Sequence, residues 1–500
     1  MIIKRCVAFQ SVSIKCSLFV SAYCVAAVEG KMVSFTGSYS PQEAQNAMEQ
    51  HTLVPYERGD LSNEGGMLNY WLFRQCRATA ALVRSMLGPV IFTFPALYQK
   101  TGFLPGLLLT LASAIWSTCT MMMIAKASDY ICQAGGKEAP PTTYGHLCGC
   151  ALKKTTFYRE TICQRISRIV NYAVAAFQIG TCCFQVKFMT THTAFLAKMA
   201  NCTFCPETSY CHLIVLPCVC IVGTISNLTT LARMALLANA LVAVVIVVVL
   251  QEAASKADLQ LLRQSGHANF ATLFQTLGAI IFAFEAQTLI LPLRNRMHQP
   301  RKLASPMGVV PLSMLTIAPV FVTIGSVGFV ALRGRSPESV LLSDQLITHQ
   351  WIQIAVIGIM IFAVMASYPF NLLAVIDILE ELWNVTLQGW SKKVKKLPLT
   401  FLLRLLLSLL VGALAMGVSN LESITSFLGG SVGMLICFVV PPLMLLPLEL
   451  DRNAASSSSS SLSVHKKRLL TTLRVAQSFI GIAVACFILT AKIASKVGGQ

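Results

Sequence analysis

Charged residues are scarce in this sequence. They make up 12% of its 500 residues, whereas hydrophobic residues make up 55%; a soluble domain carries about 25% charged residues. A chain of this composition has too little polar surface to face water on all sides. Apolar runs of about 18–25 residues recur along it, each long enough to cross a bilayer. Backbone groups in lipid must be paired within the segment, so we predict an all-α polytopic membrane protein.

Acidic residues are fewer still. Asp and Glu number 21 against 39 Lys and Arg, which gives a net charge of +18. Such a charge in a soluble protein would favour nucleic-acid binding. Here the cations lie mainly between apolar runs, so they indicate membrane topology and we predict no nucleic-acid partner. Many of the 18 cysteines lie inside the apolar runs, where they behave as small hydrophobic residues. We therefore predict neither a metal site nor a cofactor.

Several motifs are missing from the sequence. It contains no P-loop, no HExxH and no convincing Ser/His/Asp or Cys/His arrangement, so nothing indicates an ATP motor or an enzyme. An arginine-rich voltage helix and a repeated filter-like loop are also lacking, which disfavours a channel. A carrier remains as the class that fits.

The apolar runs divide the chain into eleven predicted spans. A cytosolic tail, residues 1–75, precedes them, and a serine-rich cytosolic loop, residues 448–472, precedes the last one. The predicted spans are 76–98, 103–125, 168–190, 213–229, 234–250, 271–292, 307–331, 351–376, 399–418, 423–447 and 473–492.

Lysine and arginine gather in alternate loops between these spans. This bias marks the cytosolic side of a membrane protein, so we predict a cytosolic N-terminus, in either the plasma membrane or a vacuolar or lysosomal membrane. The cations on that side include Lys137, Lys153, Lys154, Arg159, Arg165, Arg168, Arg294, Arg296, Arg301, Lys302, Lys392, Lys393, Lys395, Lys396, Arg452, Lys466, Lys467, Arg468 and Arg474.

The loop 191–212 then faces the exterior or a lumen. It carries a glycosylation sequon at Asn201 and the cysteines Cys202, Cys205 and Cys211. An oxidising compartment suits a disulfide among these cysteines, although a short sequon and neighbouring cysteines also arise by chance.

Five short segments carry a resemblance to a known family. In chain order they are 88–96 (GPVIFTFPA), 178–183 (QIGTCC), 281–286 (IFAFEA), 367–370 (SYPF) and 427–430 (FLGG). Together they resemble the amino acid/auxin permease family. Val90, Gln185 and Ala286 depart from the usual pattern of that family, so the resemblance does not transfer a particular substrate.

The resemblance implies a 5+5 inverted-repeat fold of the leucine-transporter type with one extra C-terminal helix. Residues 76–250 then form the first repeat and residues 271–447 the second, and the first helix of each is unwound at mid-membrane. Helix ends at such a break turn their dipoles toward a bound zwitterion. We expect Gly88 and Pro89 to form one break, because glycine permits unusual dihedrals and proline lacks a donor. A plain proline kink is the simpler interpretation.

The implied substrate site lies between the first and sixth spans. Its candidate residues are Ser85, Met86, Gly88, Phe282, Ala283, Phe284 and Gln185, and the candidate coupling residues are Arg84, Glu285 and Ser367. Arg84 and Glu285 lie at similar depths, roughly 12 Å and 10 Å from the cytosolic side at 1.5 Å per residue, so we expect them to face one another. In the simpler alternative Arg84 reaches for the interface and Glu285 caps backbone amides at the break.

The sequence thus predicts a secondary transporter of amino acids. The cation at Arg84 favours coupling to a proton gradient over sodium, because a fixed guanidinium takes the place of the sodium ion and repels it. Two alternatives remain open. One is a carrier of another small organic solute, such as a polyamine, an organic cation or an organic acid. The other is a low-flux nutrient sensor that signals through the tail.

Overall fold

The computed structural model describes most of the chain after the predicted tail. The described residues are 75, 78–134, 141, 143–154, 160–200, 208–225, 228–256, 269–297, 299–332, 349–386, 396–418, 420–455 and 461–497. Asn201, Cys202 and Cys205 lie outside them. Cys211 is buried in a small cluster with Ala194. The disulfide and the glycosylation site therefore stay predictions.

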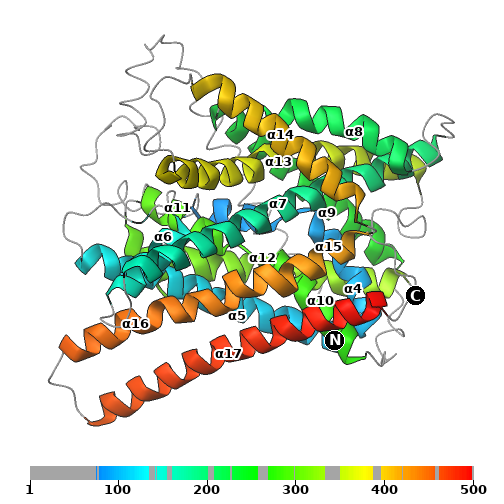
Figure 1. Ribbon diagram of the computed structural model, residues 1–500. Helices are drawn as coiled ribbons and strands as arrows, with labels where there is room; N and C mark the ends of the chain where they lie inside the picture. Colours follow the sequence, from blue (N-terminus) through cyan, green and yellow to red (C-terminus); the bar gives the residue numbers. More distant parts are fainter. Residues whose placement is uncertain are drawn as a thin grey trace, which may run out of the picture.

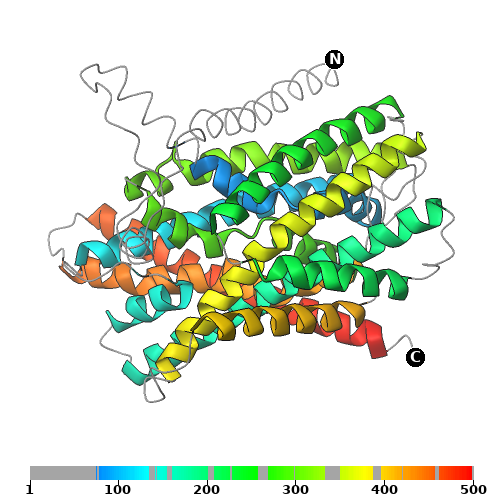
Figure 2. The ribbon, with the colours of Figure 1, turned by 90° about the horizontal axis from the view of Figure 1, so that it is seen from above.

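The described part of the chain is helical and contains no strand. Most of its long helices run side by side along one direction of the molecule (Figures 1 and 2). The principal helices are α4 (Phe94–Thr101), α5 (Phe103–Ala134), α6 (Tyr144–Lys153), α7 (Glu160–Met199), α8 (Thr208–Gly223), α9 (Leu228–Ser255), α10 (Phe270–Ala283), α11 (Gln287–Arg296), α12 (Val309–Leu332), α13 (Gln350–Thr386), α14 (Lys396–Met416), α15 (Leu421–Leu428), α16 (Val440–Ala455) and α17 (Ser461–Val497).

The helices agree with the predicted spans in type and place. Among the described residues, 8 helices are long and apolar enough to cross a membrane, or 9 if one bent pair is a single span. Two shorter apolar helices, Ser209–Gly223 and Phe401–Met416, coincide with the predicted spans 213–229 and 399–418. The exact count of eleven spans stays a prediction.

Some helices extend well beyond the hydrophobic runs. The helix α7 has 40 residues, whereas the hydropathy pattern predicts a span only over 168–190. Its N-terminal extension packs against α6, a helix of 10 residues that begins after the N-cap Thr143. The Gly145 amide there donates to the Asn171 Oδ1 atom of α7, at 2.9 Å. Ten residues are too few to cross a membrane, so the hydropathy pattern predicts only a loop here.

Glycine allows α10 and the segment after α15 to approach closely. A Cβ on Gly429 would lie 1.8 Å from the Gly278 carbonyl oxygen of α10. Gly429 begins a π-helical stretch, η6 (Gly429–Gly433), and a second one, η7 (Leu435–Val439), follows it. Such π-helical stretches occur frequently at functional sites, and here they lie beside the sixth predicted span.

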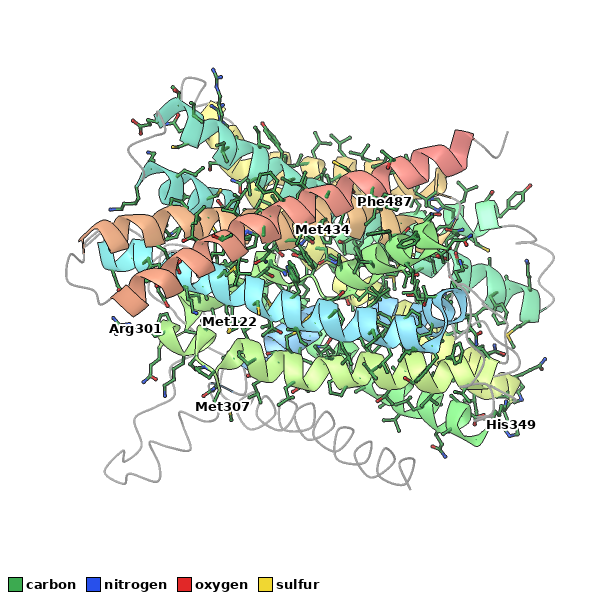
Figure 3. The ribbon with its side chains drawn as sticks, turned by 90° about the horizontal axis from the view of Figure 1, so that it is seen from below. Met122, Arg301, Met307, His349, Met434 and Phe487 are labelled. Carbon is green, nitrogen blue, oxygen red and sulfur yellow. The ribbon has the colours of Figure 1, made fainter. Side chains whose placement is uncertain are left out.

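The last helix, α17, packs against α10 and the π-helical stretches η6 and η7 from outside (Figure 1). Phe274 of α10 and Phe487 of α17 have ring centroids 4.5 Å apart. Met434 and Ile488 belong to the same apolar cluster, and Figure 3 labels Met434 and Phe487 beside α17. The extra C-terminal helix is therefore packed into the bundle.

Candidate functional site

The first predicted span is broken at Gly88. The helix Ala78–Met86 and the helical segment Pro89–Thr101 meet at an angle of 44°. Between them Gly88 has φ −113° and ψ −178°, an extended conformation that any residue adopts. The expectation that Gly88 supplies an unusual dihedral is therefore wrong. The position faces open space instead, because a Cβ there would have no heavy atom within 4 Å.

Pro89 then begins η2 (Pro89–Thr93), a short 3-10 helix that leads directly into α4. Its missing N–H costs nothing at a helix start, so the Gly88-Pro89 pair ends one helix and begins another. The chain turns from α4 into α5 at Gly102, whose φ of 88° does require glycine.

The sixth predicted span is broken between α10 and α11. The free backbone groups at this break are bound by side chains. The Ala286 amide donates to the Gln287 Oε1 atom at 2.9 Å. The Gln287 Nε2 atom donates to Ser117 at 3.1 Å and to Thr120 at 3.2 Å, both on α5. The Ser117 hydroxyl donates in turn to the Phe284 carbonyl at 2.9 Å. The break is therefore held against α5.

This network of Gln287, Ser117 and Thr120 was missed by the sequence analysis. Gln287 follows the recognised segment 281–286 directly, and it is fully buried. A buried amide must find partners, but a single sequence does not show which helix supplies them. The partners lie 170 and 167 positions away along the chain.

Glu285 lies within the break and is half-buried. Its Oε1 atom accepts a hydrogen bond from the Thr288 amide at 3.3 Å, at the start of α11. The Gln178 Nε2 atom of α7 reaches the Thr288 hydroxyl at 3.5 Å. Glu285 thus caps backbone at the helix start, as in the simpler alternative, and Gln178 contacts the same turn.

Arg84 lies against α13 instead. Its guanidinium carbon is 4.9 Å from the centroid of the Phe370 ring, and the ion pairs among the described residues do not join Arg84 to Glu285. Ser367 lies one turn before Phe370 on the same helix, and its hydroxyl donates to the Ala363 carbonyl at 2.7 Å. The structure therefore places Arg84 against α13, at a residue one turn along that helix from Ser367. The coupling roles of Arg84, Ser367 and Glu285 stay predictions.

Aromatic side chains surround the sixth-span break. Phe282 lies between Phe177 and Phe184 of α7, with ring centroids 5.5 Å from each. Phe284 packs against Phe321 of α12, at 5.1 Å. The candidate residues Phe282 and Phe284 therefore line different sides of the break, and Ala283 between them is buried.

The remaining candidates differ in what their polar atoms contact. The Ser85 hydroxyl donates to the Leu82 carbonyl of its own helix at 2.7 Å, and Met86 is buried. Gln185 on α7 is 5% exposed, and its Oε1 atom has no hydrogen-bond partner. A buried acceptor without a partner is unusual, and the role of Gln185 as a substrate ligand stays a prediction.

Ion pairs join helices at both ends of the bundle. At one end the Lys100 ammonium of α4 contacts the Glu422 carboxylate of α15. At the other end Arg294 of α11 donates from Nε and an Nη atom to the Asp129 Oδ1 atom of α5, at 2.9 Å and 2.7 Å. Each pair connects a segment of a broken span to a neighbouring helix.

The whole helical region matches a known protein family. Residues 75–491 match the family described as transmembrane amino acid transporter protein. The chain belongs to this family. Its members are transporters rather than enzymes, in agreement with the absence of catalytic motifs, and the suspected resemblance is confirmed.

Curated relatives of the chain are distant. The Caenorhabditis elegans protein "Probable amino acid transporter skat-1" is 21% identical over 260 residues, which is 51% of this chain and 55% of that protein. The Drosophila melanogaster protein "Proton-coupled amino acid transporter-like protein pathetic" is 19% identical over 362 residues, 72% of this chain and 74% of that protein. The match thus spans little more than half the length of the nematode relative.

Solved structures confirm the fold class. Mhp1, a nucleobase-cation-symport-1 family transporter in a closed conformation with bromovinylhydantoin bound, has a TM-score of 0.51 at 13% identity, over 83% of this chain and 89% of Mhp1. Its inward-facing conformation also gives a TM-score of 0.51, at 12% identity, over 84% and 91% of the two chains. The expected leucine-transporter-type fold is confirmed by this likeness.

Proposed function

We propose that this protein carries amino acids across a membrane by alternating access around its two broken spans, driven by a proton gradient without sodium. The family supports the substrate class, and the name of the fly relative is consistent with proton coupling. The observation that carries the proposal is the open space at Gly88, where the first span is interrupted.

The substrate site suits a zwitterion. The segment η2 and the helix α11 begin at the two breaks, while the helix Ala78–Met86 and α10 end there. Helix starts carry partial positive charge and helix ends partial negative charge. At the sixth-span break the Ala286 and Thr288 amides are already bound by Gln287 and Glu285, so we expect the helix ends at the first break to bind the carboxylate and the ammonium group of an amino acid. The Gln185 Oε1 atom, buried and unpartnered, is a further acceptor for a substrate N–H.

Sodium independence is proposed from Arg84. Its guanidinium lies over Phe370, one turn from Ser367. A fixed positive charge between the first span and α13 repels a second cation at that interface. The carboxylate at the sixth-span break, Glu285, is then the proposed proton carrier. Its carboxylate accepts a hydrogen bond from Thr288 at the start of α11, which places a titratable group at the break.

The proposal is tested with purified protein in proteoliposomes. Uptake of each of the twenty amino acids is measured under an imposed pH gradient and, separately, a sodium gradient. We expect uptake of at least one amino acid that follows the pH gradient alone. Uptake of polyamines or organic acids, with no amino acid carried, overturns the substrate class. An absolute requirement for sodium overturns the coupling.

The proposed role of Glu285 as proton carrier is tested separately with a single substitution. In Glu285→Gln we expect exchange of substrate to persist while uptake no longer follows the pH gradient. Glu252→Gln, at the end of α9, removes a carboxylate away from the break and is the matched control. Uptake by Glu285→Gln that follows pH as in the unmodified protein contradicts this role.

A further inference from the structure

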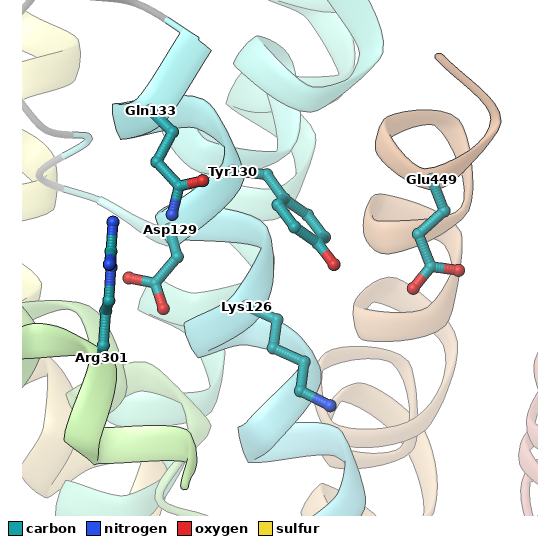
Figure 4. Close-up of a pocket in the computed structure, with 6 residues that line it drawn as sticks. All are labelled: Lys126, Asp129, Tyr130, Gln133, Arg301 and Glu449. Carbon is teal, nitrogen blue, oxygen red and sulfur yellow. The ribbon is translucent and has the colours of Figure 1, made fainter. Parts of the chain in front are cut away.

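A cavity of about 430 Å³ opens at one end of the bundle, away from the breaks in the first and sixth spans. It lies between the end of α5, the short helix η4 (Pro300–Ala304) and α16. Figure 4 shows the side chains that line it, among which the Lys126 ammonium, the Tyr130 hydroxyl and the Glu449 carboxylate point into the same space. The lining residues are Lys126, Asp129, Tyr130, Gln133, Arg301 and Glu449.

Its acidic side chains are already neutralised. Asp129 is paired with Arg294, at 2.7 Å, and Glu449 with Arg474 of α17. Lys126 and Arg301 are exposed, and the ion pairs among the described residues include neither of them. Two cations therefore remain uncompensated, and the cavity favours an anion.

The cavity lies at the depth of lipid head groups. Ser117 marks the level of the sixth-span break on α5, and Asp129 follows it by twelve positions. Twelve residues of α-helix span roughly 18 Å, slightly more than half of a hydrocarbon core about 30 Å thick. Figure 3 shows Arg301 at this same end of the bundle, opposite His349. The distribution of Lys and Arg predicts that this end is cytosolic.

An exposed apolar stripe on α5 leads to the cavity. Leu104, Leu108, Leu111 and Ile115 are 61%, 57%, 41% and 67% exposed. Their spacing of four, three and four residues places them on one face of the helix, and Lys126, eleven residues after Ile115, returns to that face. Acyl chains along this stripe would bring a lipid phosphate to Lys126.

We propose that this cavity binds the phosphate-bearing head group of an anionic phospholipid in the leaflet at this end of the molecule. Figure 4 shows Arg301 on the side of α5 that carries Asp129 and Gln133, and the Lys126 ammonium on the side that faces Glu449. The head group therefore spans both sides. The Lys126 ammonium is a compact charge for one anionic group, and the Arg301 guanidinium is a planar donor that fits two oxygens of another. The bound lipid connects α5 to η4, the segment that follows α11. It would therefore brace the inner half of the sixth span against the helix that carries Ser117 and Thr120.

The test counts bound lipid on purified full-length protein by native mass spectrometry. The probes are phosphatidylinositol 4-phosphate and phosphatidylcholine with identical acyl chains. We expect the protein to retain the anionic lipid preferentially. In the double variant Lys126→Gln/Arg301→Gln its apparent affinity should fall roughly 30-fold, since each basic side chain near a membrane surface contributes about a factor of five.

Two further variants separate the site from general charge and from misfolding. Lys154→Gln/Arg165→Gln removes two exposed cations, one directly after α6 and one on α7, at the same end but outside the cavity, and should retain the lipid. Lys126→Arg/Arg301→Lys exchanges the cations and should also retain it. An equal loss in the Lys154→Gln/Arg165→Gln variant overturns the proposal, as does loss of the lipid when both charges are preserved.

Soluble glycerol phosphate distinguishes a lipid site from a simple phosphate site. The apolar stripe predicts that glycerol phosphate, added at the same concentration as the lipid, displaces little of it. Displacement as effective as that by a short-chain phosphatidylinositol 4-phosphate overturns the assignment to a phospholipid. Retention of phosphatidylcholine equal to that of phosphatidylinositol 4-phosphate also overturns the assignment to an anionic phospholipid.

Discussion

Arg84 stacks its guanidinium on the ring of Phe370, with 4.9 Å between the guanidinium carbon and the ring centroid, and so connects the first span to α13. Contacts of this kind contribute about 0.5–2 kcal/mol, the larger values where water is excluded. Arg84 is half-buried, and its charge lies at the interface between the first span and α13. This placement gives a direct prediction for the coupling ion.

In the variant Arg84→Gln we expect uptake to become sensitive to sodium. Removing the guanidinium removes the repulsion and leaves an amide near the Ser367 hydroxyl, both of which are oxygen donors of the kind that alkali cations accept. Uptake is measured in sodium and in choline media. Phe370→Leu keeps the charge of Arg84, and its uptake should be the same in sodium and in choline media. Normal uptake by Arg84→Gln that ignores sodium would contradict the proposed role.

Thr120 and Thr118 offer a matched pair on α5. The Thr120 hydroxyl accepts from Gln287 at 3.2 Å, whereas the Thr118 hydroxyl donates only to the Ala114 carbonyl of its own helix, at 2.7 Å. Thr120→Val leaves a buried amide hydrogen without this partner, at a cost of about 1–3 kcal/mol. We expect a lower melting temperature and slower uptake for Thr120→Val than for Thr118→Val. Equal effects would show that the network does not hold the break.

Much of the fold could be predicted from the sequence because its signals are local. Hydrophobic runs locate most spans, and Pro89 marks the first break by removing a donor. The segment 281–286 similarly locates the second break between α10 and α11. The role of Gly88 could not be predicted in the same way, because a glycine in a sequence can indicate either an unusual backbone dihedral or open space beside the chain. Only the structure shows that Gly88 has an ordinary extended backbone and faces open space.

The partners in the candidate site were harder to predict, because they depend on how distant helices turn toward one another. Depth along two helices suggested that Arg84 and Glu285 would meet, but depth says nothing about the direction in which a side chain points. Arg84 lies over Phe370, and Glu285 accepts from Thr288 on its own segment. Gln287 is adjacent to a recognised motif, yet its partners on α5 leave no mark in a single sequence.

Gly429 and Gly358 differ in what surrounds them. A Cβ on Gly429 would lie 1.8 Å from the Gly278 carbonyl oxygen, whereas a Cβ on Gly358 would meet nothing within 4 Å. Gly429→Ala must therefore separate α10 from the segment after α15, and we expect strongly reduced stability and loss of uptake. Gly358→Ala, on an exposed position of α13, should be neutral or stabilise the helix by up to about 1 kcal/mol. Thermal unfolding in detergent compares the two, and an equally stable Gly429→Ala would contradict the packing.

Gly88→Leu tests the open space at the first break. The extended backbone accepts leucine without strain, and nothing lies within 4 Å of the Cβ position. We therefore expect normal expression and a melting temperature close to that of the unmodified protein, but no uptake, because the side chain fills the space proposed for substrate. Gly358→Leu should transport normally. Uptake by Gly88→Leu at unchanged apparent affinity would place the substrate elsewhere.

Lys100 and Glu422 connect the end of the first span to the start of α15, at the end of the bundle opposite the lipid cavity. Their side chains are 39% and 23% exposed, so the pair contributes at most about 1 kcal/mol to stability. In the proposed alternating access, a pair that joins helices at one end of the bundle must open for substrate to pass that end, so its effect should appear in uptake rather than in unfolding. The single reversals Lys100→Glu and Glu422→Lys place like charges together and should each slow uptake several-fold with little change in melting temperature. The exchange Lys100→Glu/Glu422→Lys rebuilds the pair and should restore most of the rate.

The same reversals at Lys153 and Glu160, an exposed pair between α6 and α7, should leave uptake unchanged. If the exchanged variant is as slow as the single reversals, the contact between Lys100 and Glu422 has no part in the transport cycle.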